Sequence, residues 1–322
     1  MTEQRFLEKR EAAWQRFEVL LHASRREFAR HAAQFPAMLY ALTGDLNIAK
    51  ANGFDPSLIE RLNRLTLNGN QLLCKPRPFS FKIITEYFIH TLPQKIRTHW
   101  RSFAACCLIF YGTAIFVALL CIVKPATISQ ILNQKTLTNM EDMYNPQSPH
   151  YFKPPNITTN ADMFAYYIYN NISIIFRTFA GGIFAGIGSL FILVTNAVFL
   201  GSLMTHLIQR GFGEPLISFV SGHSALEFTG LILGAQAGLI LGYRLFVRKG
   251  LSLHASLRDA GKTAFPLLVG GAIFGFFAAI IEAFWSSQVS ISTEVHIVFG
   301  GIITFLLIIY LLFAGKTPGN AR

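Results

Sequence analysis

The chain has 322 residues, of which 52% are hydrophobic and only 14% are charged. Soluble globular domains carry about 25% charged residues, so this composition excludes an ordinary water-soluble protein. The formal net charge is +11, which basic residues beside membrane helices and anionic lipid headgroups explain, and we expect no nucleic-acid partner.

Residues 1–101 are predicted to form a helical domain in the cytoplasm and at the membrane interface. The predicted helices cover residues 3–33, 36–51 and 56–73. Trp14 and Phe17 are among the apolar residues at helical spacing in the first of them, and Asp55 is a suitable N-cap for the third. Residues 75–78 form a proline-containing linker. The segment that ends at residue 101 is predicted to lie as an amphipathic helix on the membrane surface.

Residues 102–314 are predicted to be an all-α, polytopic membrane domain with about six membrane segments. These cover residues 102–123, 162–180, 183–208, 216–246, 264–285 and 296–314, and most are long enough for a hydrocarbon core of about 30 Å. The 162–180 segment is polar enough to re-enter the membrane instead of crossing it. Lys and Arg residues lie mainly before the first segment and in residues 247–262, which predicts that both termini are cytoplasmic. The proline-rich loop 124–161 is then extracytoplasmic, and residues 315–322 form a cytoplasmic tail.

Four glycines recur at four-residue steps in the fourth segment, and they are Gly230, Gly234, Gly238 and Gly242. Small residues at this spacing allow two helix backbones to approach closely in lipid. The partner is either a glycine-containing segment of the same chain or a second copy of the protein. The intrachain candidates are Gly182, Gly186, Gly271 and Gly275.

His223 and Glu227 lie four residues apart, so both face the same side of a membrane helix. Ionisable side chains at membrane depth are costly unless paired, which makes them candidates for function. Three interpretations are open: a hydrogen bond that locks the helices together, a proton or ion relay in a transporter, or a metal site completed by His206 or Glu282. A metal site needs three or four ligands, and one His–Glu pair is weak support for it, so we expect no metal. No nucleotide-binding or metalloprotease motif is present in the sequence, and we expect no cofactor.

Further polar residues are predicted at membrane depth, and with His223 and Glu227 they form a candidate intramembrane polar or ion site. They are Asn170, Asn171, Arg177, Asn196, His206 and Glu282. Asparagine in a helix interface commonly forms interhelical hydrogen bonds. Arg177 is expected to pair with Glu227 or Glu282, or to reach the cytoplasmic surface. His206 is predicted to be an interfacial histidine at a helix end.

Ordered motifs along the chain are similar to those of a known membrane-protein family. They are Phe6-x-x-x-Arg10-x-x-x-Trp14-x-x-Phe17, Gly53-Phe54-Asp55-Pro56, Leu92-Pro93 with Trp100-Arg101, Asn170-Asn171-Ile172, Phe176-Arg177-x-Phe179-Ala180-Gly181-Gly182 and His223-Ser224-Ala225-Leu226-Glu227. With these motifs the chain resembles the stage II sporulation protein M family of integral membrane proteins. It departs from the family pattern at residues 70–74 and at Ala197.

The resemblance implies a bacterial inner-membrane protein that acts as a scaffold or assembly protein, and it does not imply an enzyme. It also implies MoxR-type ATPases or envelope proteins as partners. We predict a homo-oligomer, with a dimer favoured, in contact with membrane lipid. The alternative function is a transporter or channel that uses the intramembrane polar residues, and the third hypothesis is an intramembrane hydrolase.

Overall fold

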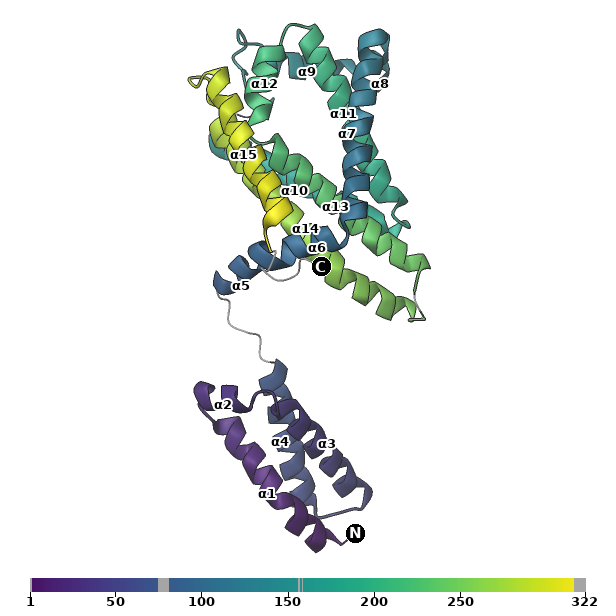
Figure 1. The fold of residues 1–322 in the computed structure, drawn as a ribbon, viewed down its shortest axis with the longest axis vertical. Coiled ribbons are helices and arrows are strands. Elements are labelled where there is room, and N and C mark those ends of the chain that lie inside the picture. Colours follow the sequence, from purple (N-terminus) through teal and green to yellow (C-terminus); the bar gives the residue numbers. More distant parts are fainter. Residues whose placement is uncertain (1, 75–80, 156, 158, 249, 316–322) are drawn as a thin grey trace. The chain divides into compact units, whose positions relative to one another are not determined.

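The computed structural model describes residues 2–74, 81–155, 157, 159–248 and 250–315. Within these residues every regular element is a helix, which confirms the predicted all-α class (Figure 1). The chain divides into two compact units, Met1–Ser80 and Phe81–Arg322. The predicted linker at 75–78 and all but the first residue of the predicted tail lie outside the described residues.

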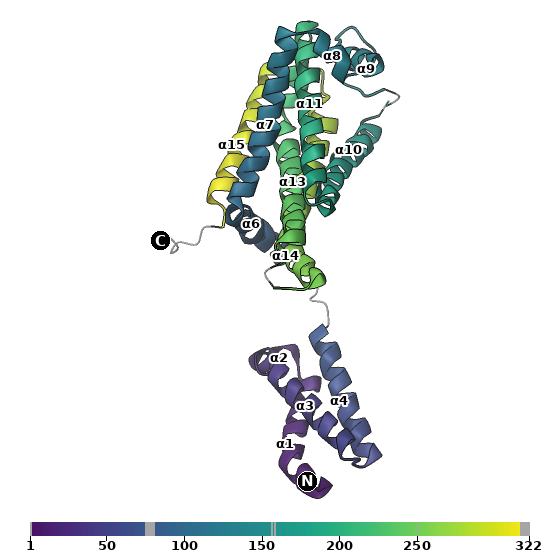
Figure 2. The same cartoon turned by 90° about the vertical axis from the view of Figure 1, so that its right-hand side faces the viewer.

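The described part of the first unit consists of α1 (Glu3–His22), α2 (Arg25–His31), α3 (Phe35–Ala51) and α4 (Pro56–Cys74) (Figures 1 and 2). The single helix predicted over 3–33 is wrong in its extent. The chain leaves α1 at Ala23, and Ser24 then caps α2 by accepting the backbone N–H of Glu27. The helices bury apolar side chains at the spacing expected for one face of each, including Phe6, Trp14, Phe17, Phe35, Leu39, Leu46 and Leu62. The unit therefore has a hydrophobic core of its own.

Two aspartates fix the geometry of this unit. Asp45 is 4% exposed and accepts hydrogen bonds of 2.8 Å from Nε of Arg10 and Nε1 of Trp14. A buried charge is tolerated only when it is paired and hydrogen-bonded, and Asp45 meets both conditions. Asp55 caps α4 as predicted, because its carboxylate accepts the backbone N–H of Ser57 at 2.7 Å. Hydrogen bonds from the Ser57 hydroxyl and backbone N–H lower the pKa of Asp55.

The segment that leads into the first membrane helix belongs to the second unit. It forms α5 (Phe81–Glu86), η1 (Tyr87–Thr91) and α6 (Leu92–Thr98). The Tyr87 hydroxyl donates a hydrogen bond of 2.6 Å to the backbone oxygen of Pro266, and Leu92 is buried against Gly270. The sequence interpretation grouped residues 81–101 with the N-terminal helices, whereas these contacts join them to the membrane unit.

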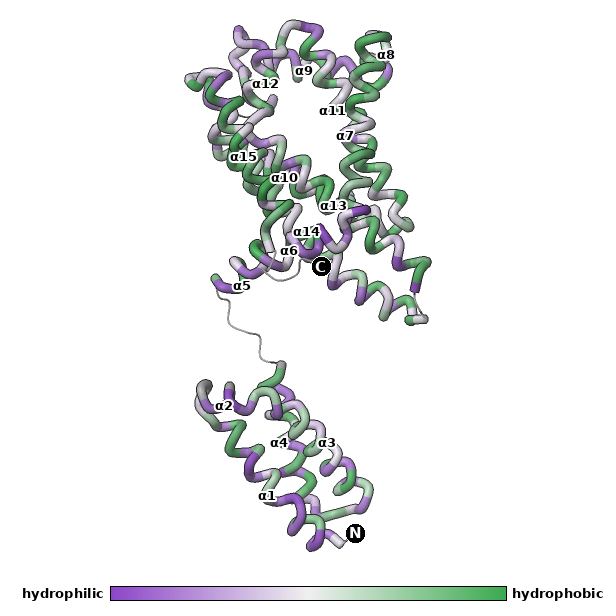
Figure 3. The backbone as a smooth tube through the Cα atoms, viewed as in Figure 1, coloured by the Kyte–Doolittle hydropathy of each residue, from purple (hydrophilic) through white to green (hydrophobic). Residues whose placement is uncertain are grey.

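Five helices within the described residues are long and apolar enough to cross a membrane. They are α7 (Trp100–Val123), α11 (Ile187–Gln209), α13 (Ser224–Phe246), α14 (Leu253–Ile281) with its continuation η3 (Glu282–Ser286), and α15 (Thr293–Phe313) (Figure 3). The polar segment α10 (Asn160–Ala180) is not among the five, and it packs against α13 and α14. The polytopic helical class is confirmed, and whether α10 crosses fully stays a prediction.

Helix α13 is the central helix of the second unit. In the most apolar 18-residue stretch of α13, 61% of the stretch is buried within the protein, whereas in that of α15 only 11% is. Its four stepped glycines face other segments of the same chain, which are α10, the short helix η2 (Gly181–Ile183) with the turn that follows it, the start of α11, and α14. The close approaches include Gly230 to Gly271, Gly234 to Ile175, Gly238 to Ser189 and Gly182, and Gly242 to Gly186. The glycine pattern thus allows backbone-to-backbone packing within the chain.

Three segments differ from the sequence prediction. The loop 124–161 is not irregular throughout, because it contains α8 (Ala126–Ile131) and α9 (Gln134–Tyr144). The prediction of one helix over 216–246 is wrong, because α12 (Gly213–Ser221) ends before α13 begins at Ser224. The fifth segment begins earlier than predicted, because Ser252 caps α14 by accepting the backbone N–H of Ala255.

Candidate functional site

Three ionisable side chains converge where α12, α13 and η3 meet. The Nε2 atom of His223 lies 3.9 Å from Oε2 of Glu227 and 3.8 Å from Oε1 of Glu282. One side-chain nitrogen or oxygen atom of each residue lies within 4.8 Å of the other two. The structure therefore places the predicted His–Glu pair on one face and adds Glu282 to it.

The local chain geometry explains why these side chains meet. Gly222 lies at the break between α12 and α13, where a Cβ atom would be 3.2 Å from Oγ of Ser286. The absence of a side chain lets this break approach η3 closely. Glu282 and Ser286 begin and end η3, which is a π-helical turn, a rare element that is frequent at functional sites. The Ser286 Oγ atom lies 3.0 Å from Nδ1 of His223 and so fixes the orientation of the imidazole ring.

The cluster lines a cavity of about 450 Å³ inside the membrane unit. The polar wall contains His223, Glu227 and Glu282 together with Asn170, Asn171 and Asn196. The aromatic wall contains Phe110, Tyr144, Tyr166, Tyr167, Phe199, Phe219 and Phe228. A volume in the range of about 300–1,000 Å³, with a few converging polar groups, is typical of sites for small ligands. The face that bears His223 is therefore a cavity wall and not a tightly packed contact between helices.

The structural interpretation of the pair, a direct hydrogen bond between His223 and Glu227, is not supported by the geometry. Hydrogen bonds from nitrogen to oxygen are about 2.7–3.2 Å long, and the atoms here are 3.9 Å apart. Two buried atoms at the cavity, Oε2 of Glu282 and the hydroxyl of Tyr167, have no hydrogen-bond partner among the described residues. An unpaired buried polar group costs about 1–3 kcal/mol, so a ligand that engages these atoms would recover that free energy.

No lysine or arginine lines the cavity in the part of the chain that the structure describes. The side chain of Arg177, which was considered as a partner of Glu227 or Glu282, is exposed and forms no ion pair with either. His206 also lies outside the cavity, because its Nε2 atom contacts Oε1 of Glu141 on α9 at 2.7 Å. The two carboxylates therefore face His223 without a cationic side chain to balance them.

The stretch of chain that forms this site matches a known family. The family model described as Stage II sporulation protein M matches residues 103–287, which run from α7 to the end of η3 and make up more than half of the chain. The chain belongs to the stage II sporulation protein M family. A second family model, described as a domain of unknown function (DUF8413), matches residues 4–75 of the N-terminal unit. No curated protein and no solved structure matches the chain.

Sequence reasoning missed several groups that surround the site in this member of the stage II sporulation protein M family. Ser286 lies four residues after Glu282, which was a predicted site residue, and residues at this helical spacing share a face. That spacing is a signal that could have revealed Ser286. Tyr144 and Tyr167 come from different helices, and no sequence spacing connects them. The buried His296 bonds to the Ser218 hydroxyl at 2.7 Å and lies outside the cavity lining.

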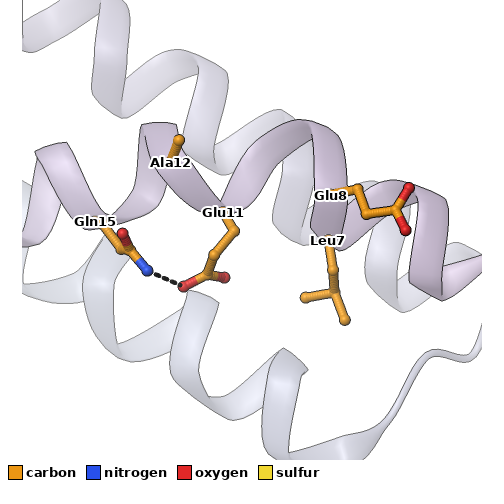
Figure 4. A pocket seen from close by; sticks show the side chains of 5 residues that line it. All are labelled: Leu7, Glu8, Glu11, Ala12 and Gln15. Atoms are coloured by element: carbon orange, nitrogen blue, oxygen red, sulfur yellow. Dashed lines mark hydrogen bonds between the residues drawn. The ribbon is translucent and has the colours of Figure 1, made fainter.

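The N-terminal unit carries a surface hollow of about 600 Å³ on α1 (Figure 4). Its lining residues are Leu7, Glu8, Glu11, Ala12 and Gln15. Nε2 of Gln15 donates a hydrogen bond of 3.2 Å to Glu11, which also accepts one of 2.9 Å from Arg61. The lining comes from one helix, and one of its two carboxylates, that of Glu11, already has partners, so the hollow lacks the converging groups of a ligand site.

Proposed function

We propose that this family member is a bacterial inner-membrane assembly protein. Its N-terminal unit binds a cytoplasmic protein, its membrane unit anchors that complex, and the loop 124–161 faces an envelope partner. Both termini are cytoplasmic in this proposal. The observation that carries it is an exposed, uncharged face on α3 of the N-terminal unit.

This α3 face consists of residues three and four positions apart, so they lie on one side of the helix. They are Ala37, Tyr40, Ala41, Gly44, Asn47, Ile48 and Ala51, and all are exposed. Tyr40 is 84% exposed. Helices α1 and α4 instead expose charged residues, among them Glu8, Lys9, Glu60 and Arg64. The centres of protein interfaces are poor in charge and enriched in aromatic residues, and the α3 face is uncharged and presents one exposed tyrosine.

A protein partner fits the α3 face better than lipid or nucleic acid does. Anionic headgroups and phosphates are bound by clustered Lys and Arg residues, and none lies on this face. The family resemblance implies a MoxR-type ATPase, and we adopt this as the partner. A second copy of the chain, as in the predicted dimer, is the competing occupant that the experiment must separate.

The test uses the full-length protein in detergent and a purified MoxR-type ATPase from the same bacterium. Tyr40→Glu places a charge on the α3 face at its one tyrosine and is expected to weaken binding about 30-fold or more, since an aromatic hot-spot residue contributes about 2 kcal/mol or more. Lys9→Glu on the exposed side of α1 is the matched control and should bind like the wild type. Equal binding by the Tyr40 variant and the wild type would contradict the proposal. If Tyr40→Glu changes the oligomeric mass of the protein measured without the ATPase, the α3 face would instead be a surface for self-association.

The cavity favours a second candidate function, which is a transporter or channel, with an intramembrane hydrolase as the third. A scaffold does not require buried carboxylates around a cavity of about 450 Å³. Ionisable residues at membrane depth commonly mark substrate or ion pathways. The cavity therefore supports ligand binding by the membrane unit alongside docking by the N-terminal unit.

Two changes separate these candidates. Removing residues 1–80 should abolish an assembly function, whereas a transporter should retain its flux because the second unit has its own core. His223→Gln with Glu227→Gln should leave an assembly protein folded and active, and it should abolish transport or catalysis. The deletion ends at residue 80 because α5 to α6 pack with the membrane unit.

A further inference from the structure

We propose that His223, Glu227 and Glu282 bind a divalent transition-metal ion, best matched by Zn²⁺, at the wall of the membrane cavity. One imidazole nitrogen and two carboxylates supply three protein ligands, two from the start of α13 and one from η3. Three protein ligands with a fourth position left for water or substrate are typical of zinc sites that act on a ligand. This metal site is independent of docking through α3.

The separations of the donor atoms suit an ion placed between them. With metal–ligand bonds of about 2.1 Å, neighbouring donors in a tetrahedral zinc site are roughly 3.4 Å apart. His223 lies 3.9 Å from the carboxylate of Glu227 and 3.8 Å from that of Glu282, too far for hydrogen bonds but close to this spacing. Small rotations of the two flexible glutamate side chains would complete the coordination.

The environment of His223 prepares its Nε2 atom to act as a ligand. A histidine that binds a metal usually donates its other ring N–H to a neighbouring group. Nδ1 of His223 lies 3.0 Å from the Ser286 hydroxyl, which is a suitable acceptor. When Nδ1 carries the proton, the lone pair of Nε2 faces two carboxylates. Three electron-rich groups repel one another at this range unless a proton or a metal ion lies between them.

Unpaired buried atoms give independent support for a ligand at this place. Glu282 is 8% exposed, and its Oε2 atom has no hydrogen-bond partner among the described residues. Tyr167 is 4% exposed, lines the same cavity, and its hydroxyl also lacks a partner there. Each unsatisfied buried group in a folded protein calls for a specific explanation, and a bound ion is one of them. A metal held by Glu282 would engage its carboxylate, and a water on the metal would be within the cavity that Tyr167 lines.

The donor types identify the class of ion. Imidazole suits Zn²⁺ and its neighbours among the transition metals, whereas Ca²⁺ takes six to eight oxygen ligands and Mg²⁺ keeps several waters. Sharing of a proton between His223 and a glutamate would bring the atoms to about 2.7–2.9 Å, and the observed separations are longer. A transition metal therefore fits better than a hard cation or a shared proton.

The test uses full-length protein prepared without a polyhistidine tag, stripped with a chelator, and titrated with Co²⁺ as a spectroscopic substitute for Zn²⁺. We expect one Co²⁺ per chain, visible d–d absorption bands of a low-coordinate site with nitrogen ligation, and displacement by Zn²⁺. Glu227→Gln and Glu282→Gln should each weaken binding by more than the roughly 10- to 100-fold typical of losing an outer-shell partner. Ser286→Ala should weaken binding within that range and retain the d–d bands, because Ser286 only orients the imidazole.

The chain offers a matched control at a second His–Glu pair. Nε2 of His206 is hydrogen-bonded to Glu141 at 2.7 Å, outside the cavity and with no third ligand within reach among the residues that the structure describes. His206→Gln combined with Glu141→Gln removes the same residue types and should leave Co²⁺ binding unchanged.

Two results would overturn the proposal. One is a wild-type protein that shows no d–d bands with Co²⁺, a result that does not depend on whether any variant folds. The other is a loss of metal in the His206–Glu141 control as large as in the Glu282 variant, which would mean that the binding is not specific to this site.

Discussion

Oε1 of Glu282 lies 3.8 Å from Nε2 of His223, across the contact between η3 and the start of α13. Both side chains are buried, no hydrogen bond joins them, and Glu227 completes the group, because its Oε2 atom lies 3.9 Å from the same imidazole nitrogen. The stability of the membrane unit should therefore depend on the charge held at this point.

Glu282→Gln is expected to raise the melting temperature of the chelator-treated protein. It should also reduce the further rise in melting temperature that Zn²⁺ causes. The change removes one of two carboxylates that lie close together at a buried place, which should increase the free energy of unfolding of the metal-free protein by on the order of 1 kcal/mol. Differential scanning fluorimetry in detergent measures both values. Glu294→Gln, at an exposed position on α15 outside the cavity lining, should leave the increase with Zn²⁺ unchanged. A lower melting temperature of the metal-free Glu282 variant would show that the carboxylate is stabilising without an ion.

Gly238→Ala is expected to destabilise the membrane unit by about 1–3 kcal/mol or more, because the added methyl group would overlap Ser189 and the backbone near Thr178. Thermal unfolding followed by circular dichroism measures the effect. Gly112→Ala on α7 is the control, since nothing lies within 4 Å of its added Cβ atom. That control should be neutral or stabilising, because alanine is favoured over glycine in helices by about 1 kcal/mol. Equal unfolding temperatures for the two variants would rule out tight packing at Gly238.

Asp45→Asn is expected to destabilise the N-terminal unit by about 1–3 kcal/mol, since its buried carboxylate accepts charge-assisted and indole hydrogen bonds. Hydrogen exchange in the full-length protein should become faster throughout α1 and α3 while the membrane helices remain protected. Glu60→Gln removes an exposed carboxylate of the same unit and should leave exchange unchanged. Protection of α1 that survives the Asp45 change would show that the apolar core alone holds this unit.

Glu141→Gln is expected to loosen α9 from α11 without unfolding the membrane unit. The carboxylate contacts His206 and Arg210, but these groups are partly exposed, so the pair contributes about 1 kcal/mol or less. Hydrogen exchange should rise over α9, and the global melting temperature should hardly move. Lys135→Gln on the same helix is the control. An equal rise in hydrogen exchange in the Lys135 variant would show that any substitution on α9 has this effect, and not the loss of the Glu141 contacts.

Cysteine labelling tests the proposed orientation in the membrane. In a variant without the native cysteines, Ser129→Cys in the 124–161 loop should react with an impermeant maleimide in intact spheroplasts. Lys9→Cys in the N-terminal unit should react only after the membrane is opened. Both positions are exposed in the structure, so their access depends on the side of the membrane. The reverse pattern would invert the topology.

The sequence by itself determined the helical class, the membrane character and much of the position of the helices. These follow from local rules, because apolar spacing and span length act within one segment. The same rules placed His223 and Glu227 on one face, identified the stepped glycines of α13 and predicted the Asp55 cap.

Only the tertiary structure decided how distant segments meet. The break at Gly222, the π turn that carries Glu282 and the exposure of Arg177 depend on packing between helices, which local spacing does not encode. The glycines predicted a close contact without naming its partner, and the fold supplied α10, η2, the start of α11 and α14. A pair of membrane residues at helical spacing thereby became a three-residue cluster on the wall of a cavity, because a third carboxylate from another helix reaches the same point.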